Sequence, residues 1–204
     1  VCASVYGLLN MGERYISVIP LAGKYIPHAS DRVIGIITEV TYSNWIVDIN
    51  SPYDGLLHIS QYPRRIEAES MSRYLKAGDC ILTMVGAVDA GMKVELTLRD
   101  KELRRLSDGR IVTINPTKMP RVIGRSGSMI RLLKSEIGCS MFVGQNGRIW
   151  INGSDDRIDL AIQAINYIET NAHNTGLTER VQAFLKAKEK TRYGRVHESR
   201  NDEE

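Results

Sequence analysis

The pattern of apolar and polar positions predicts β-strands through the first half of the chain. Apolar residues alternate with polar ones in short runs separated by turn residues, which is the period of a half-buried strand. Between Asp31 and Leu98 there are five such runs, and they cover Arg32–Val40, Trp45–Ile49, Gly55–Ser60, Asp79–Val88 and Met92–Leu98. A polar stretch after the third run contains a predicted helical turn near Ser70–Leu75. Residues 1–28 predict two more strands, Ser4–Leu9 and Arg14–Pro20, around a polar turn.

Helical periodicity appears in the second half. After a predicted strand at Arg110–Ile114, a helix is expected over Ser128–Ile137, where apolar residues recur every three to four positions and Gly138 ends the run. Strands at Cys139–Val143 and Arg148–Asn152 follow, joined by Asn146-Gly147 as a predicted type I′ hairpin turn. The next helix begins after Gly153 and presents an apolar face made of Ile158, Ala161, Ile162, Ile165 and Ile168.

A last amphipathic helix is expected after the break at residues 171–176. Thr178 is its predicted cap, and Val181, Phe184 and Leu185 lie on one side. We expect this apolar side to pack back on the preceding elements. The tail beyond Arg192 alternates in charge and is predicted to be disordered.

The turn before the helix at Ser128–Ile137 has the composition of a backbone-binding loop. Gly124-Arg125-Ser126-Gly127 places two glycines around two polar residues, so another backbone can approach closely. The free N–H groups at the start of the helix favour negative charge. Residues 118–134 carry five basic side chains and no acidic one: Lys118, Arg121, Arg125, Arg131 and Lys134. These features favour a phosphate backbone as ligand, although the glycine spacing alone fits a solvated turn equally well.

The order strand, short helix, Gly-x-x-Gly, helix, two strands and helix resembles the KH domain of the eukaryotic type. The resemblance is carried by residues 115–152, NPTKMPRVIGRSGSMIRLLKSEIGCSMFVGQNGRIWIN. KH domains clamp about four nucleotides of single-stranded RNA. The resemblance implies that residues 124–127 (Gly124, Arg125, Ser126 and Gly127) form the backbone clamp. It also implies phosphate contacts by Lys118, Arg121 and Arg131.

Five strands with a helical insertion after the third are typical of the OB fold, whose open face binds oligonucleotides. Three separated segments, VIGIITEV at 33–40, GLLHIS at 55–60 and VELTL at 94–98, resemble the S-one-type RNA-binding OB domain. The resemblance implies a binding face that includes His58, with Asp89 and Lys93 near the last hairpin.

Aromatic residues around the second predicted strand leave two interpretations open. The usual aromatic positions of the S-one-type face hold Ser43 and Ile46 here, and Tyr42 and Trp45 each lie one residue earlier. An offset of one residue turns a side chain to the opposite face of a strand. Tyr42 and Trp45 are therefore candidates for stacking on RNA bases, while Trp45 fits a core anchor equally well.

Composition limits the classes of function. The 204 residues carry a net charge of +3 with a pI near 8.8, so RNA affinity must come from local patches. The four histidines are far apart, and no catalytic set, metal site or cofactor motif assembles, which predicts a binding protein rather than an enzyme. No apolar run approaches the roughly 18 residues of a membrane span. Three cysteines with no close pair predict a reducing, cytoplasmic location.

An N-terminal β segment, an S-one-type OB domain and one KH domain, in this order, resemble the RNA-binding cap subunit of the archaeal RNA exosome. VIPLAGKYIP at 18–27, WIVDINSP at 45–52 and PRVIGRSGSM at 120–129 carry the resemblance. It implies a non-catalytic subunit that binds single-stranded RNA, three copies of which cap a hexameric ring of RNase PH-like subunits. A transcription elongation or translation-associated RNA-binding factor with the same modules is the alternative.

The predicted architecture is mixed β and α+β. It comprises a small N-terminal β domain at 1–28, a five-stranded OB barrel at 29–100, a linker at 101–109, a KH domain at 110–170, and a C-terminal helix with a charged tail at 171–204. The resemblance implies that the N-terminal and OB domains dock on the ring. RNA 3′ ends would be captured by phosphate contacts and passed to the ring, where phosphorolytic 3′→5′ cleavage occurs.

Overall fold

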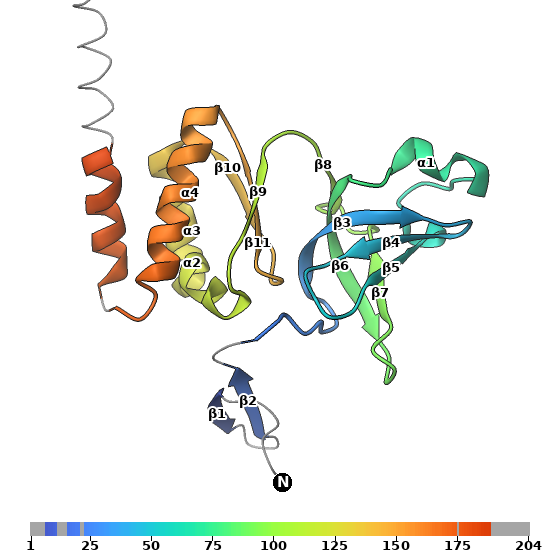
Figure 1. The fold of residues 1–204 in the computed structure, drawn as a ribbon, viewed down its shortest axis with the longest axis horizontal. Helices are drawn as coiled ribbons and strands as arrows, with labels where there is room; N and C mark the ends of the chain where they lie inside the picture. The colour runs from blue at the N-terminus through green and yellow to red at the C-terminus, as the bar shows by residue number, and fades with distance from the viewer. Residues whose placement is uncertain (1–6, 12–15, 21–22, 175, 189–204) are drawn as a thin grey trace, which may run out of the picture. The chain divides into compact units, whose positions relative to one another are not determined.

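The computed structural model describes residues 7–11, 16–20, 23–174 and 176–188. The chain forms two compact units. The first contains Val1–Met119 together with Phe142–Trp150, and the second contains Pro120–Met141 together with Ile151–Glu204. The domain boundaries expected from the sequence stay predictions, and the segment at residues 142–150 belongs to the same compact unit as the barrel. Figure 1 shows the order of the elements.

A closed sheet forms the centre of the first unit. Its strands are β3 (Arg32–Val40), β4 (Asn44–Asp48), β5 (Gly55–His58), β6 (Cys80–Val88), β7 (Val94–Thr97) and β8 (Arg104–Leu106). The strand order is β3-β4-β5-β7-β6-β8, and an additional pairing of β3 with β6 closes the barrel. All pairs are antiparallel except β5 with β7. The mixed β and α+β fold class with a five-stranded OB barrel is confirmed.

Between β5 and β6 lie η1 (Ile59–Gln61), η2 (Ala68–Ser70) and the single-turn helix α1 (Met71–Tyr74), where the sequence predicts a helical turn. Met71 and Leu75 are buried in the barrel core. Gly35 in β3 allows close strand contact, because an added Cβ would lie 2.3 Å from Cγ1 of Val47.

Strand β8 was not predicted, because the sequence interpretation took residues 101–109 as a linker. The segment pairs with β6 in the register Cys80↔Leu106 and Leu82↔Arg104. Leu103 and Leu106 are buried in the barrel core. Two leucines among charged residues give too weak a local pattern, whereas the unpaired edge of β6 offers hydrogen bonds that a helix would leave unused.

The KH-like part contains β9 (Arg110–Thr113), η3 (Pro116–Lys118), α2 (Met119–Ile123), η4 (Arg125–Gly127), α3 (Ser128–Ile137), β10 (Ser140–Val143), β11 (Arg148–Asn152) and α4 (Asp155–Thr170). Its three strands form a sheet in the order β10-β11-β9. In α3 the residues Met129, Leu133 and Ile137 are buried, at the helical spacing seen in the sequence. Gly138 ends α3 in the left-handed conformation, as its position predicts.

The hairpin turn between β10 and β11 differs from the expectation. A type I′ turn needs positive φ at both central residues, but only Gly147 has it, with φ of 84°. The turn runs from Gly144 to Gly147, and the amide of Gly144 donates to the carbonyl of Arg148 at 2.8 Å. This is a three-residue loop with glycine in the left-handed position, so the type I′ prediction was wrong. In this turn the side chain of Asn146 is fully buried.

The ends of the chain agree with the sequence patterns where they are described. β1 (Gly7–Met11) and β2 (Ile16–Pro20) pair as an antiparallel hairpin. A final helix covers residues 177–188, with Val181 and Leu185 buried. It begins at Leu177, so Thr178 lies inside the helix and the prediction that Thr178 caps it was wrong. The rings of Phe184 and of Tyr167 in α4 stack at 4.8 Å between centroids, which confirms that this helix packs back through its apolar side. The tail beyond Arg192 lies outside the described residues.

Candidate nucleic-acid interface

The Gly-x-x-Gly loop lies between α2 and α3 in a conformation that depends on its glycines. Gly124 has φ of 73° and ψ of 171°, and Gly127 has φ of 76° and ψ of 17°. Ser126 also has a positive φ of 52°. The amide of Gly124 donates to the carbonyl of Pro120 at 2.9 Å, and that of Gly127 donates to the carbonyl of Gly124 at 3.1 Å. The loop is therefore a hydrogen-bonded turn directly before α3.

The two glycines are needed for different reasons. A Cβ added to Gly124 would lie 2.7 Å from the backbone nitrogen of Met129, so this position has no space for a side chain. A Cβ on Gly127 would meet nothing closer than Cγ2 of Ile130 at 3.7 Å, so there the positive φ selects glycine. Gly127 thus leaves open surface beside the first amides of α3, where a negatively charged group is stabilised.

The three arginines in and beside the loop are exposed, and two of them, Arg121 and Arg131, were predicted to contact phosphate. Arg121 in α2, Arg125 in the loop and Arg131 in α3 all belong to the second unit. Among the residues that the structure describes, none of these three forms an ion pair. Lys118 ends η3, is half-buried and belongs to the first unit. The loop and its arginines therefore carry positive charge that no described carboxylate neutralises.

The barrel face around His58 is an open depression of about 500 Å³. His58 and Lys93 both line it, so the structure brings these two predicted residues together. The Nδ1 atom of His58 lies 2.7 Å from the hydroxyl of Ser60. Nζ of Lys93 lies 3.6 Å from a carboxylate oxygen of Glu95, which also lines the depression. The backbone amide of Lys93 donates to the carboxylate of Asp89 at 2.8 Å, so Asp89 holds the hairpin turn.

Trp45 is not available to RNA, which corrects its place among the candidates. Its side chain is fully buried, and its indole N–H donates to the carbonyl of Leu75 at 3.1 Å. The ring of Tyr62 lies 5.8 Å from it. Trp45 is therefore the core anchor that attaches the α1 segment to the barrel. Tyr42 is 78% exposed, and its contact with RNA stays a prediction.

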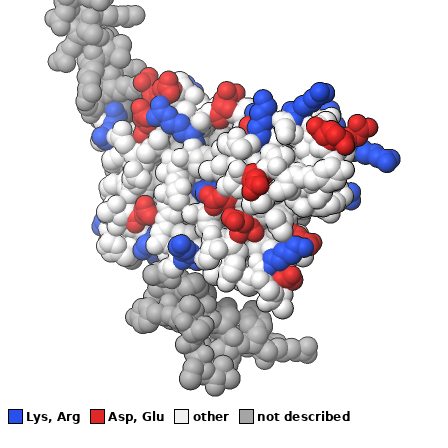
Figure 2. All heavy atoms as spheres, turned by 45° about the vertical axis from the view of Figure 1, so that its right-hand side comes forward, with Lys and Arg blue, Asp and Glu red and all other residues white. Residues whose placement is uncertain are grey.

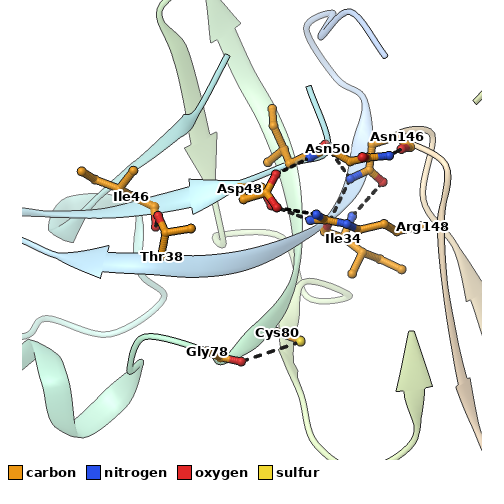
Figure 3. A network of polar contacts seen from close by, with 10 residues as sticks. Ile34, Thr38, Ile46, Asp48, Asn50, Gly78, Cys80, Asn146 and Arg148 are labelled. Carbon is orange, nitrogen blue, oxygen red and sulfur yellow. Dashed lines mark hydrogen bonds and ion pairs between the residues drawn. The ribbon is translucent and has the colours of Figure 1, made fainter. Parts of the chain in front are cut away.

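A buried polar cluster, which the sequence interpretation missed, attaches the hairpin at 142–150 to the barrel (Figure 3). The side-chain amide of Asn146 donates to the carbonyls of Ile34 and Ile49, each at 2.8 Å, and its oxygen accepts from the amide of Ile34 at 3.3 Å. Arg148 donates to the backbone oxygen of Asp48 at 2.6 Å and to its carboxylate at 2.5 Å. We call these five residues the hairpin anchor. The available signal was an arginine at the start of an otherwise apolar strand, Arg148–Asn152, because an arginine that is buried there requires a partner.

The hairpin anchor is charged as well as buried. Arg148 has 8% of its side chain exposed, and Asp48 has 41%. Partial burial alone would raise the pKa of the Asp48 carboxyl, but hydrogen bonds from the Asn50 amide and the Arg148 guanidinium lower it below its usual value. This cluster is structural, since its polar groups are used within the chain.

Metal and thiol chemistry find little support in the described part of the chain. No group of three metal-ligating side chains occurs there. Burial raises the pKa of the Cys80 thiol and of the Cys139 thiol, which makes both less nucleophilic.

No helix of the described residues is long and apolar enough to cross a membrane. Figure 2 shows Lys and Arg interspersed with Asp and Glu on one face, so local clusters matter more than an overall field there.

Comparison with known proteins decides the family. A model of the KH domain matches residues 109–157, and a model described as the S1 domain of RRP4 matches residues 24–87. The exosome complex component Rrp4 of Methanosarcina barkeri is 56% identical over 88% of this chain and 69% of its own length. The chain belongs to the Rrp4 family of exosome complex components.

Other Rrp4 relatives and a solved structure agree. The Rrp4 of Methanosarcina acetivorans is 54% identical over 90% of this chain and 71% of its own length, and that of Picrophilus torridus is 41% identical over 88% and 78%. A crystal structure described as a "putative exosome complex RNA-binding protein" matches with a TM-score of 0.77 and 38% identity, covering 83% of this chain and 99% of that one. These archaeal relatives support an archaeal origin.

Membership of the Rrp4 family confirms the predicted combination of S1 and KH modules. It also confirms that the chain is an exosome subunit of the non-catalytic kind. The alternative of a transcription or translation factor with the same modules receives no support from these relatives.

Proposed function

We propose that this Rrp4 chain is an RNA-binding cap subunit that captures single-stranded RNA 3′ ends and passes them to a phosphorolytic RNase PH-like ring. The Gly-x-x-Gly loop carries this proposal. Gly127 leaves open surface beside the start of α3, and Arg121, Arg125 and Arg131 lie before, in and after the loop without described ion-pair partners. Backbone and guanidinium donors of this kind bind phosphate groups irrespective of base sequence.

The barrel supplies a second contact in this proposal. His58, Lys93 and the exposed Tyr42 belong to the S1-type module, whose open face suits oligonucleotides. The chain itself cleaves nothing, and the RNase PH-like ring performs the phosphorolysis. Three copies per ring, docking through the N-terminal and barrel modules, are the expected assembly. The cytoplasmic location expected from the cysteines stays a prediction.

The test of the clamp uses two variants of one residue. Gly127→Asn and Gly127→Asp have the same size, and asparagine and aspartate both tolerate positive φ better than most residues. Only the aspartate adds negative charge where a phosphate would lie. We expect Gly127→Asp to lower affinity for a labelled single-stranded oligoadenylate at least about tenfold more than Gly127→Asn does, measured by fluorescence anisotropy.

A charge control separates a local from a general effect. Ser154→Asp adds the same charge at the exposed N-cap of α4, where aspartate is also a favourable cap. We expect its RNA affinity to match that of the unmodified chain. Equal affinities of both Gly127 variants would contradict the clamp. Ring docking is tested separately by co-elution of the chain with RNase PH-like subunits after RNase treatment.

A further inference from the structure

The barrel has a second depression beside the His58 face. It has a volume of about 570 Å³ and is lined by Ile59, Ser60, Tyr62, Pro63, Arg64, Arg65, Ile66 and Arg99. Ser60 lines both depressions, so the two surfaces adjoin. We call the second one the arginine groove.

The two depressions differ in charge. The His58 face contains one lysine, Lys93, which is balanced by its neighbour Glu95 at 3.6 Å. The arginine groove contains Arg64, Arg65 and Arg99, and no carboxylate is among its lining residues. Neither Arg64 nor Arg65 forms an ion pair within the part of the chain that the structure describes. Among the residues that line the two depressions, the unneutralised positive charge therefore lies in the arginine groove rather than on the face expected from the sequence.

Arg64 and Arg65 are presented on a segment that is fixed at both ends. At its start, the ring of Tyr62 lies between Trp45 and Tyr74, with centroids at 5.8 and 5.6 Å. At its end, Ile66 packs against the barrel core. The three residues between these anchors are exposed, and the first of them, Pro63, has a restricted backbone. A short anchored segment loses less conformational entropy on binding than a free loop does.

Arg99 connects the groove to the His58 face. Its Nε and one terminal nitrogen donate to the carbonyl of Ser60 at 3.0 and 2.7 Å. The hydroxyl of Ser60 in turn lies 2.7 Å from Nδ1 of His58. These contacts hold the Arg99 guanidinium at the boundary of the two depressions, where its remaining N–H groups stay available for an acceptor.

We propose that the arginine groove binds phosphate groups of the single-stranded RNA that the chain captures, continuing the path of the strand from the His58 face. This rests on the proposed RNA-binding function. Guanidinium groups suit phosphate because their planar N–H donors match its oxygens in pairs. Exposed arginines without carboxylate partners favour a polyanion over an apolar or basic partner. Glu67 and Glu69 follow in the sequence but do not line the groove.

The test replaces two of the three groove arginines, Arg64 and Arg65, in the full chain. Arg64→Gln with Arg65→Gln is compared with Lys101→Gln and Arg104→Gln, which remove the same charge from exposed positions in and before β8. Anisotropy with a labelled oligoadenylate is measured over a series of salt concentrations, with and without Gly127→Asp. Each single-strand phosphate contact contributes about 0.7 to the slope of log affinity against log salt. We therefore expect the groove variant to make the slope less steep by about 1.4 and to lower affinity at low salt about tenfold. Both changes are expected whether Gly127 is unmodified or replaced by aspartate.

Three outcomes would overturn the proposal. A groove variant that behaves like the Lys101 and Arg104 control would show that the groove does not contact RNA. Unchanged RNA binding with lost co-elution of exosome subunits would assign the groove to a protein partner. If the unmodified chain binds no RNA at any salt concentration, the proposed RNA-binding function fails together with the groove proposal. In the first two outcomes the unmodified chain still binds RNA, so only the groove proposal fails.

Discussion

Replacement of Asn146 by alanine tests whether the hairpin anchor stabilises the first compact unit. Asn146 has no exposed surface, and its side chain makes three hydrogen bonds, one to the amide of Ile34 and one each to the carbonyls of Ile34 and Ile49. The pairing of β3 with β4 begins only at Ile36, so at Ile34 the asparagine takes the place of a neighbouring strand. Alanine cannot donate or accept these bonds.

The magnitude follows from the groups left without partners. The carbonyl of Ile34 retains a contact with Arg148 at 3.3 Å, but the amide of Ile34 and the carbonyl of Ile49 lose their asparagine partner. A buried polar group without a partner costs about 1–2 kcal/mol, so the free energy of unfolding should fall by about 2–4 kcal/mol. For a chain of this size, about 2–4 °C is lost per kcal/mol, which predicts a Tm lower by about 4–16 °C.

The assay is thermal unfolding followed by circular dichroism, with two comparison variants. Asn166→Ala changes an exposed asparagine of α4 and should leave Tm the same or slightly higher, because alanine favours helix. Asn146→Asp keeps the shape but loses both donated bonds and places a buried charge against two carbonyls, so it should destabilise more than alanine does. The reasoning is refuted if Asn146→Ala and Asn166→Ala unfold at the same temperature.

Two other predictions concern the same barrel. Trp45→Phe should lower Tm, because the indole bond to the Leu75 carbonyl is lost, yet leave RNA affinity in an anisotropy assay unchanged; a loss of affinity at full stability would return Trp45 to the binding face. Because folding lowers the pKa of Asp48, its ionised carboxyl stabilises the folded chain at pH values above the pKa of the unfolded state, near 4. This stabilisation is lost as the pH falls through the pKa of the folded state. Urea unfolding between pH 7 and pH 2 should therefore show a smaller loss of stability in Asp48→Asn than in the unmodified chain, and parallel curves would contradict this assignment.

Local patterns in the sequence determined most elements of the fold and the position of the loop that carries the proposed function. β3, α3 and the Gly-x-x-Gly turn follow from strand alternation, helical spacing and glycine placement, all of which act over a few neighbouring residues. Gly124 and Gly127 adopt the positive φ values that such a turn requires. The family follows from the same residues, because the order of the modules is itself a property of the sequence.

Only the tertiary structure decided which faces are buried and which partners are used. A register shift between Ile37 and Glu39 occurs where β3 pairs with β4, and Trp45 points into the core while its neighbour Ile46 is half-buried outside it. Sequence spacing cannot place such a bulge, and one residue of register turns a side chain to the other face. Strand β8 and the Asn146 contacts likewise depend on segments about 25 and 100 residues away. The arginine groove also depends on tertiary structure, because Arg99 contacts the carbonyl of Ser60, 39 residues away in the sequence, only in the folded barrel.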